Sequence, residues 1–528
     1  MSTSDAVVIG AGHNGLISAI RLADAGWDVT VLESRAVAGG AVASAELVPG
    51  YRADLFSAFY PLAVASPGFE GLELEAHGLR WSRAPIPFGH PAAPDDDQAA
   101  VVHPDPSDTA AELSRHDARD GDAWMELVTQ WRAIRPALLN TLFRPFPPTR
   151  GPLQLLRAVG TGDALRLARF FVLPANRMVT ELFRSEHARL LLLGNAMHAD
   201  IPLDAPGSGM MGYLLTMLAQ DSGFPVPVGG AGELAAALVR RAESAGVRVL
   251  LGHRVDHIDV SGGRATGVLT ADGHHWSARR AVLADVSAPM LYNQLLAPSD
   301  VPSRLTRDIG RFDWDTPVVK VDYALRERIP WNSPNLGGAG TVHLGADTRG
   351  LVRWMADLNT GVVPRRPFLL FGQMTTADPT RSPAGTESAW AYTHLPRDIS
   401  DDDSALRLAA HTDAVLEEYA PGFGELIVGR HVHTPSELHG EDQNLHAGAV
   451  NGGTAQLFQQ LIFRPTPGLG GAETAIRGLY LASAAAHPGG GVHGACGNNA
   501  ALAALACDGL RGLPRRRGTH WLIGHLSR

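Results

Sequence analysis

The order of apolar and glycine-rich stretches at the start of the chain predicts a β-α-β unit. A short β-rich run at residues 6–9 ends in the glycine turn at 10–15. A helical pattern follows at once, with apolar residues at 16, 20 and 22 and Gly26 as the expected C-terminal cap. A second apolar run at 27–32 is closed by an acidic residue. Strand, turn, helix and strand therefore occur in the order that a parallel unit requires.

The spacing of Gly10, Gly12 and Gly15 is that of a dinucleotide-binding turn. In such a turn the first glycine permits the tight bend, the second lets a pyrophosphate approach the backbone, and the third lets helix and strand pack closely. The helix N-terminus then offers free N–H groups to the phosphates. Glu33, at the end of the second strand, is placed to accept hydrogen bonds from a ribose. NAD and FAD both use this unit.

Two further glycine-rich segments favour FAD. Gly39 and Gly40 follow the acidic residue, where flavoproteins often bring a second glycine turn against the pyrophosphate. Near the other end of the chain, a turn and strand at 477–483 run into the triglycine segment 489–491, and an alanine-rich helix is expected from about 494 to 507. Three glycines allow the backbone to pass close to a flat ligand, and the helix behind them can stabilise negative charge on a reduced flavin. Taken alone, the segment also suits a loop before a surface helix.

The pattern in the middle of the chain predicts a second domain that is inserted into the nucleotide-binding domain. Residues 246–285 are expected to form short strands that return to the nucleotide unit. Residues 96–228 are mostly helical in pattern, and 300–464 mix strands with a helix. The glycines at 229–232 are interpreted as a helix start, because no suitable strand precedes them and no acid closes a following strand. With no second Rossmann unit, we expect reduced flavin to pass electrons to oxygen, a quinone or another small acceptor.

Composition narrows the class of protein. The 528 residues are too many for one compact core, and 45% hydrophobic with 19% charged residues is typical of a globular chain. The net charge of −9 argues against nucleic acid as a partner. Two cysteines outside any CxxC motif argue against disulfide reduction. Lys320 is the only lysine, which we attribute to codon usage. No apolar run approaches the roughly 20 residues that span a bilayer, and only five residues precede the first strand, so we expect a cytoplasmic protein.

The 22 histidines are the remaining candidates for chemistry. Two pairs alternate on predicted strands and so share a face: His431 with His433, and His253 with His257. A metal site would need a third ligand, which nothing in the sequence marks, so we predict none. His487 and His493 flank the triglycine turn. Either is a candidate acid or base beside the flavin, and a purely structural role in shaping the loop is equally compatible with the sequence.

Several motifs together resemble the phytoene-desaturase-like branch of FAD-dependent oxidoreductases, which includes carotenoid desaturases, isomerases and ketolases. Beside the two glycine sites, the matching stretches are PGYR at 49–52, LELEAHGL at 72–79, PVGGAGEL at 227–234 and Arg464-Pro465. The branch also contains a group named for a pyridine nucleotide-disulfide oxidoreductase domain. The motifs are specific for the branch and not for a substrate.

The resemblance implies an α/β fold: a Rossmann-type FAD-binding domain of the glutathione-reductase-like class, with an inserted α+β substrate domain. On this basis we assign 1–95, 229–300 and 465–513 to the FAD domain, 96–228 and 301–464 to the substrate domain, and 514–528 to a tail. The residues that the resemblance implies for FAD are Gly10, Gly12, Gly15, Glu33, Gly39, Gly40, a backbone contact near Val255, and the Gly491–Val492 turn. Relatives usually carry glycine where 483–486 stand here, so contacts to the flavin at that place are open.

The expected activity is FAD-dependent dehydrogenation or desaturation of a lipophilic small-molecule substrate, isoprenoid or carotenoid-like, with the oligomeric state left open. Two alternatives remain: a flavin amine oxidase, for which we locate no aromatic cage, and a non-catalytic lipid escort protein on the same scaffold. Escort proteins tend to lose the glycine and acid constellation that is kept here. In the tail, Arg511 and the arginines at 515–517 precede Trp521 and neighbouring aliphatic residues. This composition suits peripheral contact with an anionic membrane surface, and it equally suits a disordered terminus whose arginines aid solubility.

Overall fold

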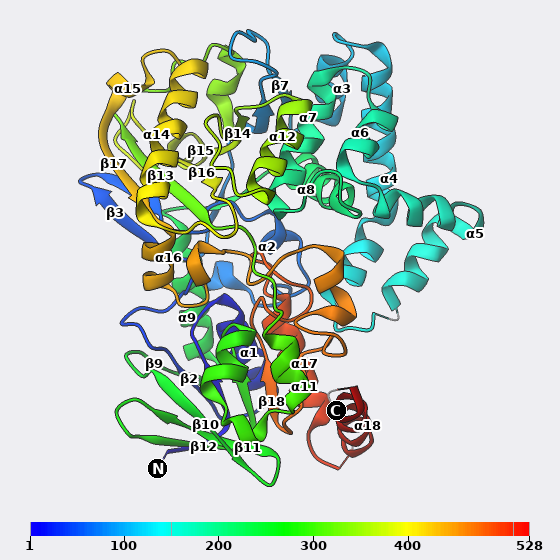
Figure 1. The fold of residues 1–528 in the computed structure, drawn as a ribbon, viewed down its shortest axis with the longest axis vertical. Helices are drawn as coiled ribbons and strands as arrows, with labels where there is room; N and C mark the ends of the chain where they lie inside the picture. The colour runs from blue at the N-terminus through cyan, green and yellow to red at the C-terminus, as the bar shows by residue number, and fades with distance from the viewer. Residues whose placement is uncertain (1, 149, 511, 527–528) are drawn as a thin grey trace.

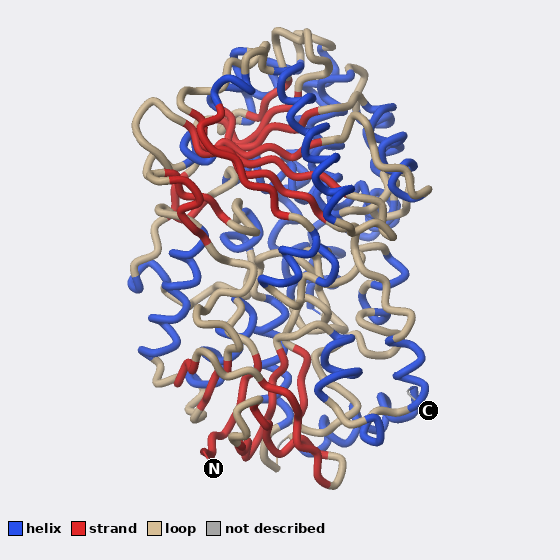
Figure 2. The backbone as a smooth tube through the Cα atoms, turned by 60° about the vertical axis from the view of Figure 1, so that its left-hand side comes forward, coloured by secondary structure: helices blue, strands red, loops and turns tan. Residues whose placement is uncertain are grey.

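Two seven-stranded sheets organise the protein. The structure is a computed structural model, and it describes residues 2–148, 150–510 and 512–526. In Figure 1 the first sheet lies at the lower end, near the N-terminus, and the second lies at the upper left. Figure 2 shows the strands gathered at the two ends of the molecule, with helices and loops between them. The site is built in this middle region.

The first sheet carries the predicted β-α-β unit. Its order is β10-β11-β12-β1-β2-β9, and β18 pairs with the second half of β12. β1 pairs in parallel with both β2 and β12, as the unit requires. The strands are β1 (Ser2–Ile9), β2 (Val29–Leu32), β9 (Arg248–Leu250), β10 (Val255–Ser261), β11 (Arg264–Thr270), β12 (His275–Ala284) and β18 (Leu479–Leu481).

Apolar residues on both faces of β1 explain why this sheet lies in the core. Ala6 and Val8 pack with three helices, α1 (His13–Asp24), α9 (Ala231–Ser244) and α17 (Ala495–Cys507). Val7 and Ile9 point to the opposite face and join a second cluster that includes residues of β10 to β12. A continuous apolar run is what a parallel strand covered on both faces needs.

The second sheet is mostly antiparallel. Its order is β17-β13-β16-β15-β14-β6-β7, and the β14–β6 pair is parallel. Its strands are β6 (Ile86–His90), β7 (Ala100–Val102), β13 (Val318–Leu325), β14 (Ala339–Leu344), β15 (Leu369–Gln373), β16 (Glu387–His394) and β17 (Ile427–His433). Two small ladders pair β3 (Ser44–Val48) with β4 (Tyr51–Asp54), and β5 (Trp81–Ser82) with β8 (Val226–Pro227).

Helices cover both faces of this second sheet. α14 (Asp402–Tyr419) and α15 (Phe423–Leu426) pack on one face. Residues of the opposite face join a core with the helical part at the upper right of Figure 1. That part comprises α3 (Pro106–Leu113), α4 (Ala118–Phe143), α5 (Arg150–Val172), α6 (Ala175–Leu182), α7 (Glu186–Ala196), α8 (Ser208–Ser222) and α12 (Thr348–Asn359). The remaining helices are α2 (Pro61–Ala65), α10 (Ala288–Met290), α11 (Ser303–Ile309), α13 (Met374–Ala377), α16 (Pro435–Glu441) and α18 (Leu513–Leu526).

Some expected boundaries differ from the strand pairing. β6 lies within the segment 1–95 that we assigned to the FAD domain, yet it pairs in the second sheet. Conversely, residues of α11 lie beyond position 300 and pack into the core of the first sheet. Within the segment 96–228 that is mostly helical in pattern, the apolar stretch at 190–217 belongs to two helices, because Pro202, Pro206 and Gly207 interrupt it. Nothing in local composition marks the first two differences, which depend on long-range pairing.

The C-terminal segment is helical and partly packed. Ile523 of α18 is 4% exposed and joins the core beside the first sheet, whereas Trp521 is 71% exposed. Arg515 pairs with Glu473 at 3.1 Å. Arg511 lies outside the described residues. Among the residues described, no helix is both long and apolar enough to cross a membrane.

Candidate active site

The first glycine turn joins β1 to α1, and neighbouring atoms leave little room for side chains at its three glycines. Gly10 has a φ of +95°, and its N–H donates to the carbonyl of Leu32 at 2.8 Å. A Cβ atom at Gly15 would lie 2.2 Å from the carbonyl oxygen of Gly10. Gly12 is the N-cap of α1 and offers no side chain to the first turn of the helix. The turn therefore presents bare backbone at a helix N-terminus, which suits a phosphate.

The second glycine turn lies directly against the first. The N–H of Gly39 donates to the carbonyl of Ala11 at 2.9 Å. A Cβ atom at Gly40 would lie 3.2 Å from the Cα atom of Gly12. Both glycines have positive φ, at +128° and +55°. The two segments that the sequence analysis linked are thus in contact.

Glu33 lies beside these turns and is 7% exposed. Its Oε2 accepts a hydrogen bond from the N–H of Ala11 at 2.7 Å. Its backbone carbonyl accepts the N–H of His253 at 2.7 Å, two residues before Val255 opens β10. The hairpin strands therefore return to the end of β2, next to the acid expected to bind the ribose.

Asp285 is a site residue that the sequence analysis missed. It follows β12 directly, and its Oδ2 accepts the N–H of Gly15 at 2.8 Å. Burial raises the pKa of this carboxyl to about 8, with Asp442 and Glu33 adding to the effect. A Cβ atom at Gly12 would lie 2.7 Å from the same oxygen. The only signal in the sequence was an acid at the end of a buried strand. The pairing of β12 with β1 is what brings this acid beside the first glycine turn.

His493 supports the C-terminal glycine loop. Its Nε2 lies 3.1 Å from the carbonyl oxygen of Gly489, and its Nδ1 accepts the N–H of Ala495 at 3.1 Å, where α17 begins. Burial lowers its pKa to about 3. Both ring nitrogens are therefore engaged with backbone, so the neutral ring holds the loop against the helix.

His487 has a different environment. It is 5% exposed, and its ring lies 5.6 Å from that of Phe146. Within the described part of the chain neither ring nitrogen has a hydrogen-bond partner. Burial lowers its pKa to about 4, and the charge of Arg464 acts in the same direction. His487 is thus held neutral among apolar and cationic neighbours.

The two ends of the chain meet through α1 and α17. A Cβ atom at Gly497 would lie 1.9 Å from the carbonyl oxygen of Asn14, so the helices approach as closely as backbones allow. The N–H of Gly497 also donates to Asn14 Oδ1 at 3.3 Å. A Cβ atom at Gly491 would lie 3.0 Å from Leu62. The expected juxtaposition of the first and last segments is therefore present.

Arg464, the first residue of the Arg-Pro motif, holds two loops together through its guanidinium group. Its side chain is fully buried, and its guanidinium donates to carbonyl oxygens of two separate loops. Nη2 donates to Ala484 at 2.7 Å and to Gly452 at 3.0 Å, while Nη1 donates to Thr454 at 2.9 Å. Burial lowers its pKa to about 10. The residue braces the loop 451–454 against 483–486, the segment where relatives carry glycine.

A buried polar cluster, which the sequence analysis did not identify, meets the triglycine loop. Asn451 donates through Nδ2 to Asp200 Oδ2 at 2.8 Å. The other carboxylate oxygen of Asp200 lies 2.8 Å from His394 Nε2. Although burial acts to lower it, the pKa of His394 is raised because Asp200 and Asp315 favour the charged ring. A Cβ atom at Gly490 would lie 2.5 Å from the carbonyl oxygen of Asn451, so the cluster reaches the loop.

The same face of the second sheet carries further titratable groups. Trp390, Tyr392 and His394 alternate along β16 and so share one face. On the neighbouring strand, Lys320 pairs in register with Tyr392 and is 4% exposed. Its ammonium is ion-paired with Asp322. A cation buried within an apolar strand is costly unless it is paired, and Asp322 is the partner that Lys320 needs.

A fully buried ion triad links β4, the segment between α13 and β16, and the start of α9. Arg381 contacts Asp54 Oδ2 at 3.0 Å and Asp378 Oδ2 at 2.9 Å. Asp54 in turn accepts the N–H of Ala231 at 2.7 Å, and Asp378 accepts the N–H of Gly229 at 2.8 Å. The triad therefore fixes the PVGGAG segment, which the sequence analysis interpreted as a helix start, and α9 does begin there.

The assembled site fits FAD. Glycine turns at both ends leave a cradle that side chains would fill, next to the N-termini of α1 and α17. This fold and this site define an FAD-dependent oxidoreductase with a Rossmann-like nucleotide domain. The chain belongs to the flavin containing amine oxidoreductase family, whose pattern matches residues 109–501. Residues 8–64 match the NAD(P)-binding Rossmann-like domain.

Individual relatives agree with the resemblance seen in the sequence. The chain is 29% identical to pyridine nucleotide-disulfide oxidoreductase domain-containing protein 2 of Rattus norvegicus, over 94% of this chain and 92% of the relative. It is 26% identical to a lycopene-forming phytoene desaturase of a Paracoccus species, over 96% and 97%. An oxidoreductase structure from Methanosarcina mazei superposes with a TM-score of 0.58 at 16% identity, covering 96% of this chain and all of that one. The phytoene-desaturase-like assignment is confirmed.

Proposed function

We propose that this oxidoreductase dehydrogenates or desaturates a lipophilic small-molecule substrate, isoprenoid or carotenoid-like. The observation that carries the proposal is the buried Asp200–His394 pair, which Asn451 ties to the triglycine loop. Relatives of similar length include phytoene desaturases. We further propose the glutathione-reductase-like class for the nucleotide domain, with the second sheet and α3–α8 forming the substrate domain.

We assign FAD to the residues around the two glycine cradles. The pyrophosphate would lie at Gly10, Gly12 and Gly15, supported by Gly39 and Gly40, and the ribose at Glu33. The backbone near Val255 would lie by the adenine, and the Gly491–Val492 turn by the flavin ring. When bound, FAD supplies a hydride acceptor for a substrate C–H bond.

The chain's own groups would handle the proton and line the glycine loop. For a substrate that loses a hydride and a proton from adjacent carbons, we propose that Asp200 accepts the proton, with His394 stabilising its carboxylate beforehand. Leu62 and Phe143 lie against the glycine loop and contribute apolar surface there. We propose that His493 and His487 shape the loop, since His493 uses both nitrogens on backbone and His487 lies against Phe146.

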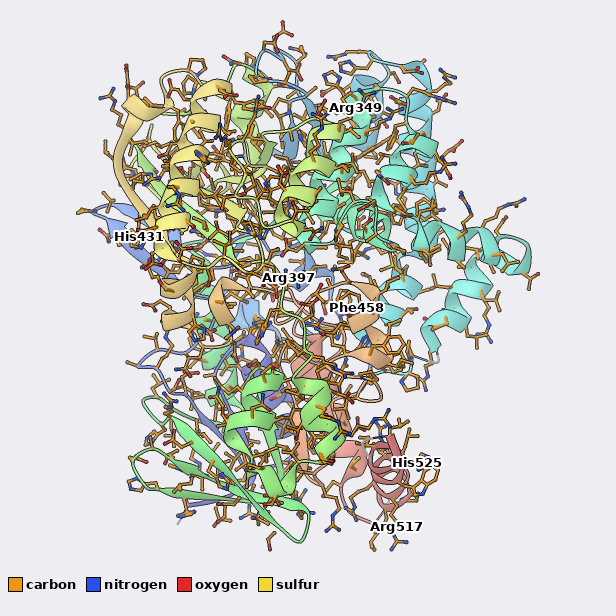
Figure 3. All side chains as sticks on the ribbon, viewed as in Figure 1. Arg349, Arg397, His431, Phe458, Arg517 and His525 are labelled. Carbon is orange, nitrogen blue, oxygen red and sulfur yellow. The ribbon has the colours of Figure 1, made fainter. Side chains whose placement is uncertain are left out.

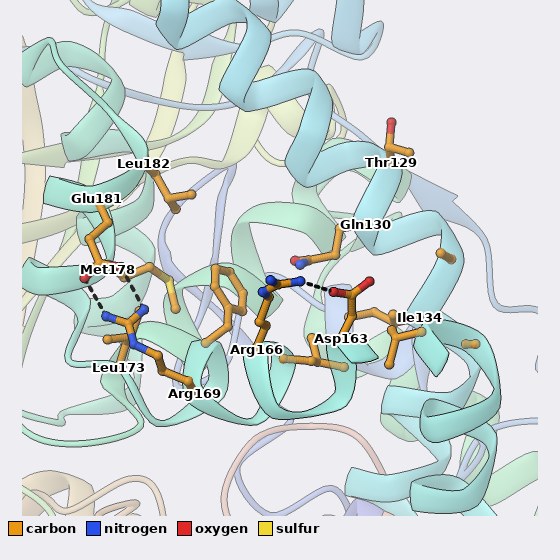
Figure 4. Close-up of a pocket in the computed structure, with 15 residues that line it drawn as sticks. Thr129, Gln130, Ile134, Asp163, Arg166, Arg169, Leu173, Met178, Glu181 and Leu182 are labelled. Atoms are coloured by element: carbon orange, nitrogen blue, oxygen red, sulfur yellow. Dashed lines mark hydrogen bonds and ion pairs between the residues drawn. The ribbon is translucent and has the colours of Figure 1, made fainter. Parts of the chain in front are cut away.

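A groove in the helical part is lined by both apolar and charged side chains. It has a volume of about 500 Å³ and lies between α4, α5 and α6, away from the glycine turns. Figure 4 shows Ile134, Leu173, Met178 and Leu182 lining it, with the ion pairs Arg166–Asp163 and Arg169–Glu181 among the residues around it. We regard it as a holding surface for an apolar chain rather than as the reaction site.

The proposed electron acceptor is oxygen or a quinone, because the region around Gly229 and Gly230 forms the start of α9 and not a second nucleotide turn. The proposed location is the cytoplasm, with α18 resting on the inner face of the membrane. Trp521 and Leu522 project from this helix, at 71% and 49% exposed.

A flavin amine oxidase is the second candidate. The rings of Trp390 and Tyr392 are stacked, with centroids 5.9 Å apart and planes 21° apart. Asp200 and Asp315 raise the pKa of Tyr392 further after burial, which places two buried acids beside the aromatic pair. Aromatic faces beside carboxylates suit a cationic amine.

Anaerobic reduction of the bound flavin by candidate substrates separates the two. Isoprenoid or carotenoid hydrocarbons should bleach the flavin, whereas primary amines should not. Asp200→Asn should slow bleaching by roughly 10²–10⁴-fold with FAD still bound. Asp259→Asn, at the exposed His275–Asp259 pair, is the matched control and should leave the rate unchanged. Bleaching by amines alone would replace the proposal with the second candidate.

A further inference from the structure

The edge of the second sheet carries a cluster of three ligand-type side chains. His431 and His433 alternate on β17, and Thr434 then caps α16 by accepting the N–H of Glu437. The cap turns the chain back over the strand, so Glu437 Oε1 lies 2.7 Å from His431 Nε2 and 3.7 Å from His433 Nδ1. Figure 3 shows His431 at the left margin of the molecule. The third ligand that the sequence did not mark is therefore supplied by the turn after β17.

The spacing of these atoms suits a small divalent ion. All three ligand atoms lie within 4.8 Å of one another. Around a tetrahedral ion with Zn–N distances of 2.0–2.1 Å, ligand atoms would be about 3.3 Å apart. The separations of Glu437 Oε1 from the two imidazole nitrogens, 2.7 and 3.7 Å, bracket this value, and the two imidazole nitrogens lie within 4.8 Å of each other.

A separate contact fixes the proton on His433. Its Nε2 lies 2.8 Å from Asp322 Oδ2, and Asp322 is itself held by the buried ammonium of Lys320. Because a carboxylate only accepts, the Nε2–H must donate, and the lone pair is then on Nδ1, facing Glu437. Histidines that bind metals are usually oriented by such a carboxylate on the other ring nitrogen. This contact lies outside the cluster and is independent of it.

We propose that His431, His433 and Glu437 form a binding site for a divalent transition-metal ion of the zinc class. Two imidazoles with one carboxylate favour Zn²⁺ and its first-row neighbours over Ca²⁺ or Mg²⁺, which prefer oxygen ligands. The side chains of His431 and Glu437 are 42% and 37% exposed, so water reaches the open coordination positions. His433 is 5% exposed and anchors the site to the sheet.

The ion would hold α16 against β17, and the end of α16 lies next to the second glycine turn. Glu437 belongs to α16, whose last residue, Glu441, pairs with Arg35 at 2.8 Å. The next residue, Asp442, lies 3.4 Å from where a Cβ atom of Gly40 would be. A ligand that fixes α16 to β17 therefore also holds the residues behind the second glycine turn. The role is structural and does not depend on the substrate proposed above.

Equilibrium dialysis of the FAD-loaded, chelator-treated full chain against Zn²⁺ alone tests the site. One tightly bound ion per chain is expected. His431→Ala and Glu437→Gln remove partly exposed ligands and should each weaken binding by more than the roughly 10–100-fold that loss of an outer carboxylate costs. His103→Ala is the matched control, since His103 pairs with Glu112 at the same kind of distance, 2.8 Å, and belongs to no such cluster among the residues that the structure describes.

Thermal unfolding gives a second readout. Zn²⁺ should raise the unfolding temperature of the native chain and of His103→Ala, and should not raise that of His431→Ala. Equal zinc affinity and equal thermal shifts in all four proteins would overturn the proposal, and would assign the cluster to simple His–Glu ion pairing. Less than one tight equivalent in the native chain would overturn it as well.

Discussion

Replacing Arg381 by methionine is expected to destabilise the protein strongly. The side chains of Arg381, Asp54 and Asp378 are 0%, 0% and 1% exposed, so the substitution leaves two carboxylates without their counter-ion inside the protein. Removing one partner of a buried ion pair typically costs about 3–5 kcal/mol. The backbone bonds from Ala231 to Asp54 and from Gly229 to Asp378 remain, and they only partly replace the lost charge.

The measurement is the denaturant dependence of unfolding, followed with and without added FAD. The control is Arg366→Met, because Arg366 and Glu418 form an ion pair at 2.8 Å whose side chains are 47% exposed. That variant should lose less than about 1 kcal/mol. Adding Asp54→Asn and Asp378→Asn to Arg381→Met should recover part of the loss, since the uncompensated charges are then removed. A loss no larger than that of the control would refute the reasoning.

Four further predictions follow from the site. Gly12→Val should purify without yellow colour, because its side chain would fill the space through which a pyrophosphate approaches this turn; a folded variant with a full flavin spectrum would contradict this. Asp285 keeps its proton in the folded state up to about pH 8, so its contribution to stability is complete below the unfolded value of 3.8 and is lost as the pH rises toward 8. Asp285→Asn should flatten that decline in unfolding midpoints measured between about pH 5 and 9; an unchanged slope would count against it. NADH and NADPH should reduce the flavin slowly in stopped-flow mixing under nitrogen, and rapid saturable bleaching would show a different electron path. Full-length protein should co-sediment with acidic liposomes more than an Arg517→Ser, Trp521→Ser variant, which spares the buried Ile523; equal pelleting would remove the membrane contact.

The nucleotide unit could be predicted because its signals are local. A strand, a GxGxxG turn and a helix follow one another within about 25 residues. Each glycine of the turn stands where a side chain would clash with nearby atoms. Gly39 and Gly40 were predictable for the same reason. The C-terminal loop was recognisable from three adjacent glycines before a helix, and α17 begins where the pattern indicates.

The polar cluster could not be predicted in this way, because its members are far apart in the chain. Asp200, His394 and Asn451 come from the end of a helical segment, the end of β16 and a loop. Each taken singly resembles many other acids, histidines and amides in the sequence. Their meeting depends on how the second sheet packs over the loop that Arg464 braces.

The sequence by itself determined the nucleotide-binding unit, its cofactor class and the family, because the first two depend on spacing within single turns and the third on short motifs along the chain. Only the tertiary structure decided which acids surround the site, where the second sheet begins, and that His431 and His433 have Glu437 as a third neighbour. Lys320 shows the difference most clearly. Composition gives its rarity, but its burial and its partner Asp322 arise only when β13 takes its place between β16 and β17. The steric demands of a turn depend on residues that are neighbours in the sequence, whereas burial and charge pairing depend on residues that only folding brings together.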